Sequence, residues 1–364
     1  DARIHNARLM LAEGHFQAGN FGPAAAAYGK IDLQHIAAEN HPGLRYRLAS
    51  ALLQSGQREA ALLAFNVFIE KHPDHPQAAH AIVKRAESFM EAGELPQAHR
   101  EFERLIAVAT DHKLKEYAWV QKARLYKEAN DLPRFADCHR HLLTDFPNRE
   151  PRRLAASQFW LGWALYRQDK FEDCLEPFQR ARMAEPKELG RESTLHLALA
   201  KYQLQRRDEL KSELDTLLRD YPKEKIPRPV FAWLGTAFAS TGNHQEAWRY
   251  LRHAITPREP TKTKVVVWRA AGRSALEAGA CEEALRPLEI VLQVEENDFR
   301  KAETNFLLAR AHFTLKDPER ARKAAEACLA FKPQGELNAR ARLLLGDIAM
   351  SQGDPNTGAG HYVV

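Results

Sequence analysis

The sequence predicts an all-α solenoid of about ten antiparallel helix pairs. Two observations carry this prediction: one residue pattern recurs along the whole chain, and its apolar positions have helical spacing. The residues that mark the polar turn of each unit are Gly19, Gly56, Gly93, Asn130, Asp169, Gln205, Gly242, Gly279, Lys316 and Gly353. Successive markers are 37, 37, 37, 39, 36, 37, 37, 37 and 37 residues apart. We therefore predict one repetitive domain over residues 1–364.

Small residues flank each turn at fixed distances. Seven positions before the marker stand Ala12, Ala49, Ala86, Ala123, Gly162, Ala198, Gly235, Gly272, Ala309 and Gly346. Five positions after the marker the residue is again small in eight of ten units, with Phe135 and Leu210 in place of a small residue in the others. Four positions further on, most units have a large apolar residue such as Tyr28 or Phe178, one helical turn away. Two helices should therefore approach closely at one point in every unit.

Proline and the absence of alternating strand patterns support helices of roughly 14 residues. The prolines that close second helices are Pro73, Pro147, Pro186, Pro222 and Pro333. A proline inside a helix costs about 3 kcal/mol, so each marks a helix end. The β-branched stretch "TKVVVW" at 263–268 falls where the register places the start of a first helix, and we predict helix there.

Irregular features are expected in the middle and at the ends of the chain. The bulky Phe135 and Leu210 flank the 39-residue and 36-residue spacings, which predicts changed stacking between about 130 and 210. The closing "GAGHYVV" stops midway through a second helix, and the first residues already have a helical pattern. We expect truncation at both ends, which would permit self-association through uncapped repeats.

Composition favours a folded protein with a mixed surface. Hydrophobic residues make up 45% and charged residues 28% of the chain. The chain has 53 basic and 48 acidic residues, which gives a net charge of +5. Charge alone therefore does not indicate a nucleic-acid ligand, and no apolar run is long enough to predict a membrane span. The four cysteines are far apart and are expected to be buried.

No catalytic or cofactor signature is present. The nucleotide-binding glycine loops, the zinc-protease helix motif, the nucleophile elbow and the calcium loop are all missing from the sequence. Two histidine clusters are candidate metal sites, namely Cys138, His139 and His141, and His72, His75 and His80. Their spacing suits packed or solvated side chains better than ligands. We predict no enzyme activity, no metal and no cofactor.

Residues 159–186 resemble the tetratricopeptide repeat. The matching residues are Leu161, Gly162, Leu165, Phe171, Cys174, Phe178, Ala181 and Pro186. The resemblance extends over essentially the whole chain, although the unit is about three residues longer than the family's 34-residue period. It implies a right-handed superhelix whose first helices line a concave groove for peptide or protein partners. The longer unit is similar to repeats of bacterial outer-membrane assembly lipoproteins and periplasmic coordinators, which implies the cell envelope in preference to the cytoplasm.

The resemblance also implies which residues face the groove. In the fifth unit these positions hold Phe159, Trp163, Tyr166 and Arg167, and neighbouring units add Arg124, Lys127 and Tyr202. Aromatic side chains with arginine are the usual anchors of interfaces. The alternative is that the same aromatic residues pack against neighbouring repeats.

A second candidate site is a group of arginines. Arg269 and Arg273 lie four residues apart on one helix, and Arg310 is the repeat equivalent of Arg273. They could bind an acidic side chain or a chain terminus through charge-assisted hydrogen bonds. The alternative is that they are solvated and paired with carboxylates such as Glu277 or Glu303.

The predicted function is a non-catalytic scaffold for protein–protein interaction. One alternative is the binding of nucleic acid or another anionic polymer along basic loops, because residues 147–153, 222–229 and 257–264 each sum to +2. The other alternative is a regulatory or targeting region of a larger enzyme. We favour a protein or peptide partner, since the sequence "EENDFRK" interrupts the basic loops.

Overall fold

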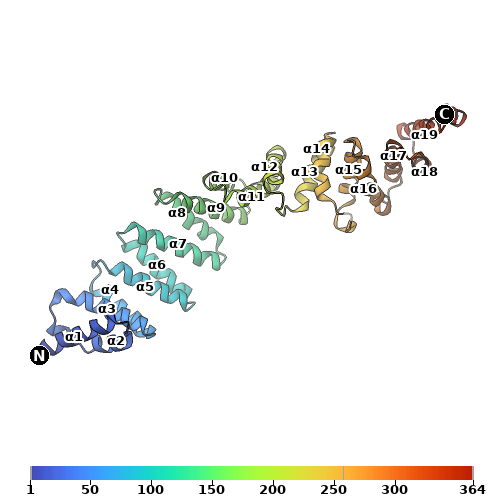
Figure 1. The fold of residues 1–364 in the computed structure, drawn as a ribbon. Helices are drawn as coiled ribbons and strands as arrows, with labels where there is room; N and C mark the ends of the chain where they lie inside the picture. Colours follow the sequence, from blue (N-terminus) through green and yellow to red (C-terminus); the bar gives the residue numbers. More distant parts are fainter. Residues whose placement is uncertain (1, 257, 363–364) are drawn as a thin grey trace. The chain divides into compact units, whose positions relative to one another are not determined.

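The computed structural model describes residues 2–256 and 258–362, and every regular element in them is helical. These residues form twenty α-helices and three short 3-10 helices (Figure 1). Consecutive helices pack against each other in pairs. The prediction of an all-α chain of helix pairs is confirmed.

The chain divides into two compact units, Asp1–Ser193 and Thr194–Val364. The first unit contains α1 (Ala2–Gln17), α2 (Phe21–Gly29), η1 (Leu33–His35), η2 (Ala38–Asn40), α3 (His41–Gln54), α4 (Arg58–Lys71), α5 (Ala78–Glu91), α6 (Leu95–Val108), α7 (His112–Glu128), α8 (Leu132–Thr144), α9 (Pro151–Arg167) and α10 (Leu175–Ala184). Helix α11 (Gly190–Gln203) includes the boundary. The second unit continues with α12 (Arg207–Asp220), α13 (Arg228–Ser240), α14 (His244–Ala254), η3 (Pro260–Lys262), α15 (Val265–Glu277), α16 (Cys281–Val294), α17 (Asp298–Thr314), α18 (Pro318–Ala330), α19 (Glu336–Ser351) and α20 (Pro355–Tyr362).

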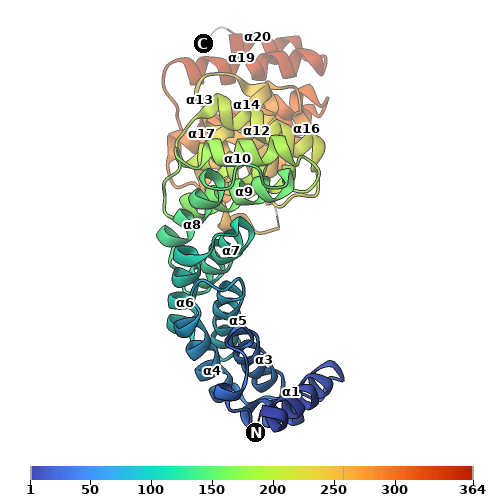
Figure 2. The same cartoon turned by 90° about the vertical axis from the view of Figure 1, so that its left-hand side faces the viewer.

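Within each unit, the odd-numbered helices are the first helices of the pairs and the even-numbered helices are the second. First helices pack on their own second helices, as α7 does on α8, and second helices pack on the next first helix, as α8 does on α9 (Figure 2). The same succession links α15, α16 and α17 in the second unit. The first helices of adjacent pairs therefore lie next to one another and share a surface.

A left-handed residue ends the first helix of every pair. All ten turn markers have positive φ, including the four that are not glycine, Asn130, Asp169, Gln205 and Lys316. The next residue donates its backbone N–H to the carbonyl five positions earlier, as in Lys170 to Leu165 at 3.0 Å. This pairing is the Schellman motif, which satisfies the last carbonyls of a helix and reverses the chain in two or three residues. The repeat therefore has a local hydrogen-bonded cause.

The small residues lie at close helix crossings, as predicted. A Cβ atom on Gly235 would stand 2.5 Å from Cγ of Leu251, and one on Gly272 would stand 2.6 Å from Cγ of Leu288. The large residue of the second helix thus packs directly on the backbone of its own first helix. In the third pair, Phe102 also contacts Tyr117 of the next pair, with ring centroids 6.2 Å apart. These residues fill the space inside their own pair as well as the space between pairs.

Helix ends and cysteines also follow the sequence. Each of the five closing prolines lies one to three residues beyond the end of a second helix, and α15 begins at Val265 inside the β-branched stretch. All four cysteines are buried and free. The described helices include none with the length and apolar character needed to span a membrane. The changed stacking near residues 130–210 stays a prediction.

Candidate functional site

A cavity of about 350 Å³ opens on the first helices of the fourth and fifth pairs. Helices α7, α8 and α9 and the loop before α9 form its walls. The side chains that give it its chemistry are Arg124, Lys127, Phe135, His139, Arg149, Arg153 and Trp160. We name it the Trp160 pocket. No carboxylate is among its lining residues in the described part of the chain.

The bulky residue at a normally small position builds the aromatic wall of this pocket. Phe135 is buried, and its ring meets Trp160 and Trp163 edge to face, with centroids 6.2 and 6.0 Å away. The two tryptophans also meet edge to face at 5.7 Å. Such contacts add about 0.5–1.5 kcal/mol each beyond the burial of apolar area. The substitution of phenylalanine for alanine therefore produces a fixed aromatic cluster in this repeat.

Cations lie on this aromatic wall. The Lys127 ammonium stands 3.6 Å from the centroid of Trp160 and 5.7 Å from that of Trp163. The guanidinium of Arg167 lies 5.2 Å from the centroid of Trp163. No ion pair with a carboxylate is recorded for Lys127 among residues 2–256 and 258–362. The rings hold the Lys127 ammonium group in place, and its positive charge remains available to a ligand.

A buried ion pair fixes the opposite wall. The Arg149 side chain is only 6% exposed and donates to Oε1 of Glu116 at 2.9 Å and to Oγ of Ser157 at 2.8 Å. Arg153 reaches the same Glu116 oxygen at 3.2 Å. One carboxylate therefore serves two guanidinium groups, and the pocket keeps an excess of positive charge.

His139 forms part of the lining beneath the aromatic wall. Its ring meets Phe135 edge to face at 4.6 Å, and its Nδ1 is buried without a hydrogen-bond partner among the described residues. Burial, together with the positive charges of Arg149 and Lys127, lowers the pKa of His139 from its usual 6.5 to about 3. The imidazole is neutral at physiological pH. It contributes shape and no charge.

The predicted residues of the fifth pair occupy different environments. Phe159 is buried and packs against Phe178 at 5.6 Å, so it lies in the core. Trp163 and Tyr166 are partly buried, and burial raises the pKa of the Tyr166 phenol. Arg167 is exposed. That these positions bind a partner stays a prediction. Trp163 lies beside the Trp160 pocket because its ring contacts Trp160, and Arg167 lies over the ring of Trp163.

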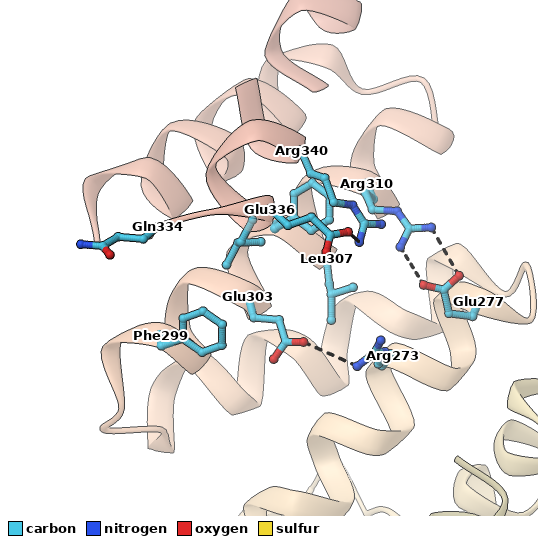
Figure 3. Close-up of a pocket in the computed structure, with 11 residues that line it drawn as sticks. Arg273, Glu277, Phe299, Glu303, Leu307, Arg310, Gln334, Glu336 and Arg340 are labelled. Atoms are coloured by element: carbon cyan, nitrogen blue, oxygen red, sulfur yellow. Dashed lines mark hydrogen bonds and ion pairs between the residues drawn. The ribbon is translucent and has the colours of Figure 1, made fainter. Parts of the chain in front are cut away.

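The predicted arginines of the second unit divide between two places. Arg273 and Arg310 line a cavity of about 310 Å³ formed by α15, α17 and α19, which we name the Arg273 pocket. Arg310 faces Glu277, with Nη1 and Oε1 2.7 Å apart, and Arg273 faces Glu303 at 3.5 Å (Figure 3). These are the ion pairs that the alternative interpretation of the arginines predicted.

The same pocket has a third pair of opposite charges. Arg340 lies 3.5 Å from Glu336 (Figure 3). Its guanidinium stands over the ring of Phe306 at 5.3 Å. Three arginines thus face three glutamates. Arg269 lies elsewhere, because its partner is the buried Glu295 at 2.9 Å, and it is not among the residues that line the Arg273 pocket.

Tyr202 is partly buried and meets Trp233 of the next first helix edge to face at 5.9 Å. Arg124 pairs with Glu128 on its own helix at 3.1 Å, and both side chains are largely exposed. The two histidine clusters weighed as metal sites do not assemble: among the described residues, no group of three or more possible ligands could hold a metal ion.

Sequence reasoning missed Trp160, Arg149 and Trp233. A signal for the tryptophans exists, since Trp160 and Trp233 each stand two positions before the small residue of their unit. The resemblance pointed instead to the position three before the small residue, where Phe159 and Phe306 are buried. A shift of one residue turns a helical side chain by about 100°, enough to exchange a core position for a surface position.

Comparisons with known families agree with the helix-pair geometry. Two family models, each described as tetratricopeptide repeat, match this chain: one at residues 44–75, the other at residues 269–336 and 307–359. The matches fall in both compact units. A search of curated proteins found no significant match.

Solved structures with similar folds are distant in sequence. A tetratricopeptide repeat protein from Parabacteroides merdae is 15% identical, with a TM-score of 0.38, over 75% of this chain and 99% of its own. The TPR2AB domain of yeast Sti1, solved with pHSP90, is 12% identical, with a TM-score of 0.38, over 81% of this chain and 100% of its own. YrrB, described as having an unusual peptide-binding site, is 15% identical, with a TM-score of 0.34, over 56% of this chain and 96% of its own. These superpositions are too loose to carry an argument, and none addresses the cell-envelope location, which stays a prediction.

Proposed function

We propose that this chain, a tetratricopeptide repeat protein, is a non-catalytic scaffold that binds peptide or protein partners along its first helices. The observation that carries the proposal is the Trp160 pocket, a cavity of about 350 Å³ with an aromatic wall, four basic side chains and no lining carboxylate. Tryptophan and arginine in a partly desolvated depression are the residue types that dominate binding energy in protein interfaces.

The pocket chemistry defines a partner segment. A large apolar side chain would pack against Trp160, and a neighbouring carboxylate would meet Lys127 and Arg124. The rigid setting favours this role, because Phe135 and Lys127 already hold the Trp160 ring and little side-chain freedom is lost on binding. The predicted neighbours Trp163 and Arg167 would extend the contact along α9.

A direct test measures fluorescence anisotropy with a short labelled peptide of alternating Asp and Phe. We expect the full chain to bind it, and Trp160→Ala to weaken binding roughly tenfold, in line with the loss of a central aromatic anchor. Trp119→Ala is the matched control, because Trp119 lies on α7 and stacks on His141 at 4.2 Å without lining the pocket. Circular dichroism verifies that both variants are folded.

Two results would contradict the proposal. One is equal binding by wild type and Trp160→Ala. The other is an equal loss with Trp119→Ala, which would point to general destabilisation. The double variant Trp163→Ala/Tyr166→Ala examines the sequence-based site: retained helicity with weaker binding supports a partner surface, and collapse of the fold places both residues in the core.

A further inference from the structure

A second cavity, of about 380 Å³, lies on the first helices of the second unit. Helices α11, α13 and α15 contribute to its walls. It also joins two of the basic loops singled out in the sequence, because Arg228 and Pro229 come from residues 222–229 and Lys262, Thr263 and Lys264 come from residues 257–264. We name it the Trp233 pocket. Pro257 of the second loop lies outside the described residues.

An aromatic pair supplies the apolar side of this pocket. Trp233 and Tyr202 meet edge to face at 5.9 Å, and both are partly buried. Val266 adds an aliphatic side chain that is 51% exposed. The basic loops therefore have aromatic side chains beside them in this pocket.

The charges of the pocket are one-sided. Arg228, Lys262 and Lys264 line it, and no carboxylate does so among the described residues. Lys262 has a partner, since its Nζ lies 2.8 Å from Oε1 of Glu259. For Arg228 and Lys264, no ion pair is recorded within residues 2–256 and 258–362. Two positive charges are thus uncompensated at one cavity.

Two helix starts reinforce this positive potential. Helix α13 begins at Arg228 after Pro227, and α15 begins at Val265 after Lys264. Neither preceding side chain accepts a hydrogen bond from the first turn, and neither proline nor lysine has an acceptor to offer. Pro229 has no N–H, and Val230 and Val267 already donate to the carbonyls of Pro227 and Lys264. The N–H groups of Arg228, Val265 and Val266 therefore remain to attract anionic oxygen.

We propose that the Trp233 pocket binds a phosphorylated peptide segment, with the phosphate at Arg228 and Lys264 and a neighbouring apolar side chain against Trp233 and Tyr202. A phosphate monoester carries a charge near −2 at neutral pH and three acceptor oxygens, which matches two free cations and two helix starts better than a single carboxylate does. The proposal rests on the proposed peptide-binding function but concerns a separate pocket in the other unit.

The test compares two labelled peptides of one sequence, Leu-Ser-Phe with Gly-Ser flanks, with and without phosphate on the serine. We expect the full chain to bind the phosphorylated form at least roughly tenfold more tightly. The double variant Arg228→Gln/Lys264→Gln should remove that preference. The matched control is Lys225→Gln/Arg258→Gln, which removes the same charge from the same two loops at exposed residues that do not line the pocket.

Three outcomes would overturn the proposal. They are equal affinity for the two peptides, an equal loss in the control variant, and displacement by adenosine monophosphate at concentrations as low as those of the phosphopeptide. Trp160→Ala separates this proposal from the first one, since it should weaken only the Asp/Phe peptide. If the Asp/Phe peptide binds and the phosphopeptide does not, only the Trp233 proposal fails, and if neither binds, both fail.

Discussion

The Trp160 pocket and the Arg273 pocket differ in their charge: the first has an excess of basic side chains, and in the second arginines and glutamates balance. Arg124, Arg273 and Arg310 each stand one position after the small residue of their unit. Arg124 pairs within its own helix, with Glu128. Arg273 and Arg310 instead pair with glutamates from neighbouring first helices. One repeat position thus supplies an arginine paired within its own helix in one unit and arginines paired between helices in the other.

The difference shows that neighbouring repeats determine the charge of each cavity. Three glutamates balance three arginines around the Arg273 pocket, whereas four basic side chains line the Trp160 pocket and two of them, Arg149 and Arg153, share the inter-repeat carboxylate Glu116. Surface ion pairs contribute little to stability, and their larger effect is on which ligand a surface attracts. An acidic partner should therefore select the Trp160 pocket.

Removing the carboxylate of Glu116, which holds Arg149 in the wall of the Trp160 pocket, should have the largest effect. Glu116→Ala leaves the nearly buried Arg149 guanidinium without its ion-pair partner, although Ser157 still accepts one hydrogen bond. Loss of one partner from a buried pair destabilises strongly, and we expect a decrease of about 3 kcal/mol in the free energy of unfolding. Urea denaturation followed by circular dichroism measures it.

The exposed pair of the same pocket provides the control. Glu128→Ala also removes a carboxylate from α7, but the Arg124–Glu128 pair has side chains 66% and 48% exposed. We expect a change below about 0.5 kcal/mol. Similar losses for the two variants would show that the Arg149–Glu116 pair does not fix the wall of the pocket.

The pH dependence of stability gives a second prediction. Since the pKa of His139 is lowered from 6.5 to about 3, the unfolded chain binds a proton below pH 6.5 that the folded chain does not. Stability should fall by about 1.4 kcal/mol for each pH unit below 6.5 until the folded-state pKa is reached. His139→Leu should remove this component, as measured by urea denaturation at several pH values.

A change in the same cluster that removes no titratable group tests the assignment. Phe135→Leu loses the contacts of that ring with Trp160 and with His139 itself. It should lower stability by a similar amount at every pH and retain the slope. If His139→Leu keeps the wild-type slope, the imidazole is protonated in the folded protein, and its role as a neutral part of the lining is wrong.

The fold was predictable because its causes are local. A left-handed marker such as Lys316 or Gly242 and the Schellman hydrogen bonds around it involve residues within one short segment, so they appear in the sequence at a fixed period. The small residues were visible for the same reason: Gly235 and Leu251 are 16 positions apart in a constant register.

The candidate site was less predictable because it depends on contacts between repeats. Nothing local in the sequence indicates that Glu116 reaches Arg149, or that Lys127 lies on Trp160. The groove register taken from the family resemblance also placed Phe159 on the surface, while the structure buries it and places the partly buried Trp160 in the pocket lining. Pairings with Glu277 and Glu303 were anticipated, because carboxylates at those repeat positions fall beside the arginines.

A small change in stability is expected when two of the three balancing carboxylates of the Arg273 pocket are removed. In Glu277→Gln/Glu303→Gln, Arg310 and Arg273 lose their partners but stay solvated, so the free energy of unfolding should fall by less than about 1 kcal/mol. The ligand preference should change more, because the cavity becomes cationic and should acquire binding of the Asp/Phe peptide. Glu282→Gln/Glu326→Gln, on the second helices α16 and α18, removes equal charge elsewhere and should not.

The Arg310–Glu277 pair should also make the free energy of unfolding depend on pH. The hydrogen bond from Arg310 holds the pKa of Glu277 below its usual 4.5, so the stabilisation is complete above pH 4.5 and disappears as pH falls through the lowered pKa. The small stability difference between wild type and Glu277→Gln should therefore be present at pH 7 and absent in strong acid. If Glu277→Gln/Glu303→Gln still does not bind the Asp/Phe peptide, charge balance does not explain the different ligand preferences of the two pockets. The aromatic wall formed by Phe135 and Trp160 must then account for that difference.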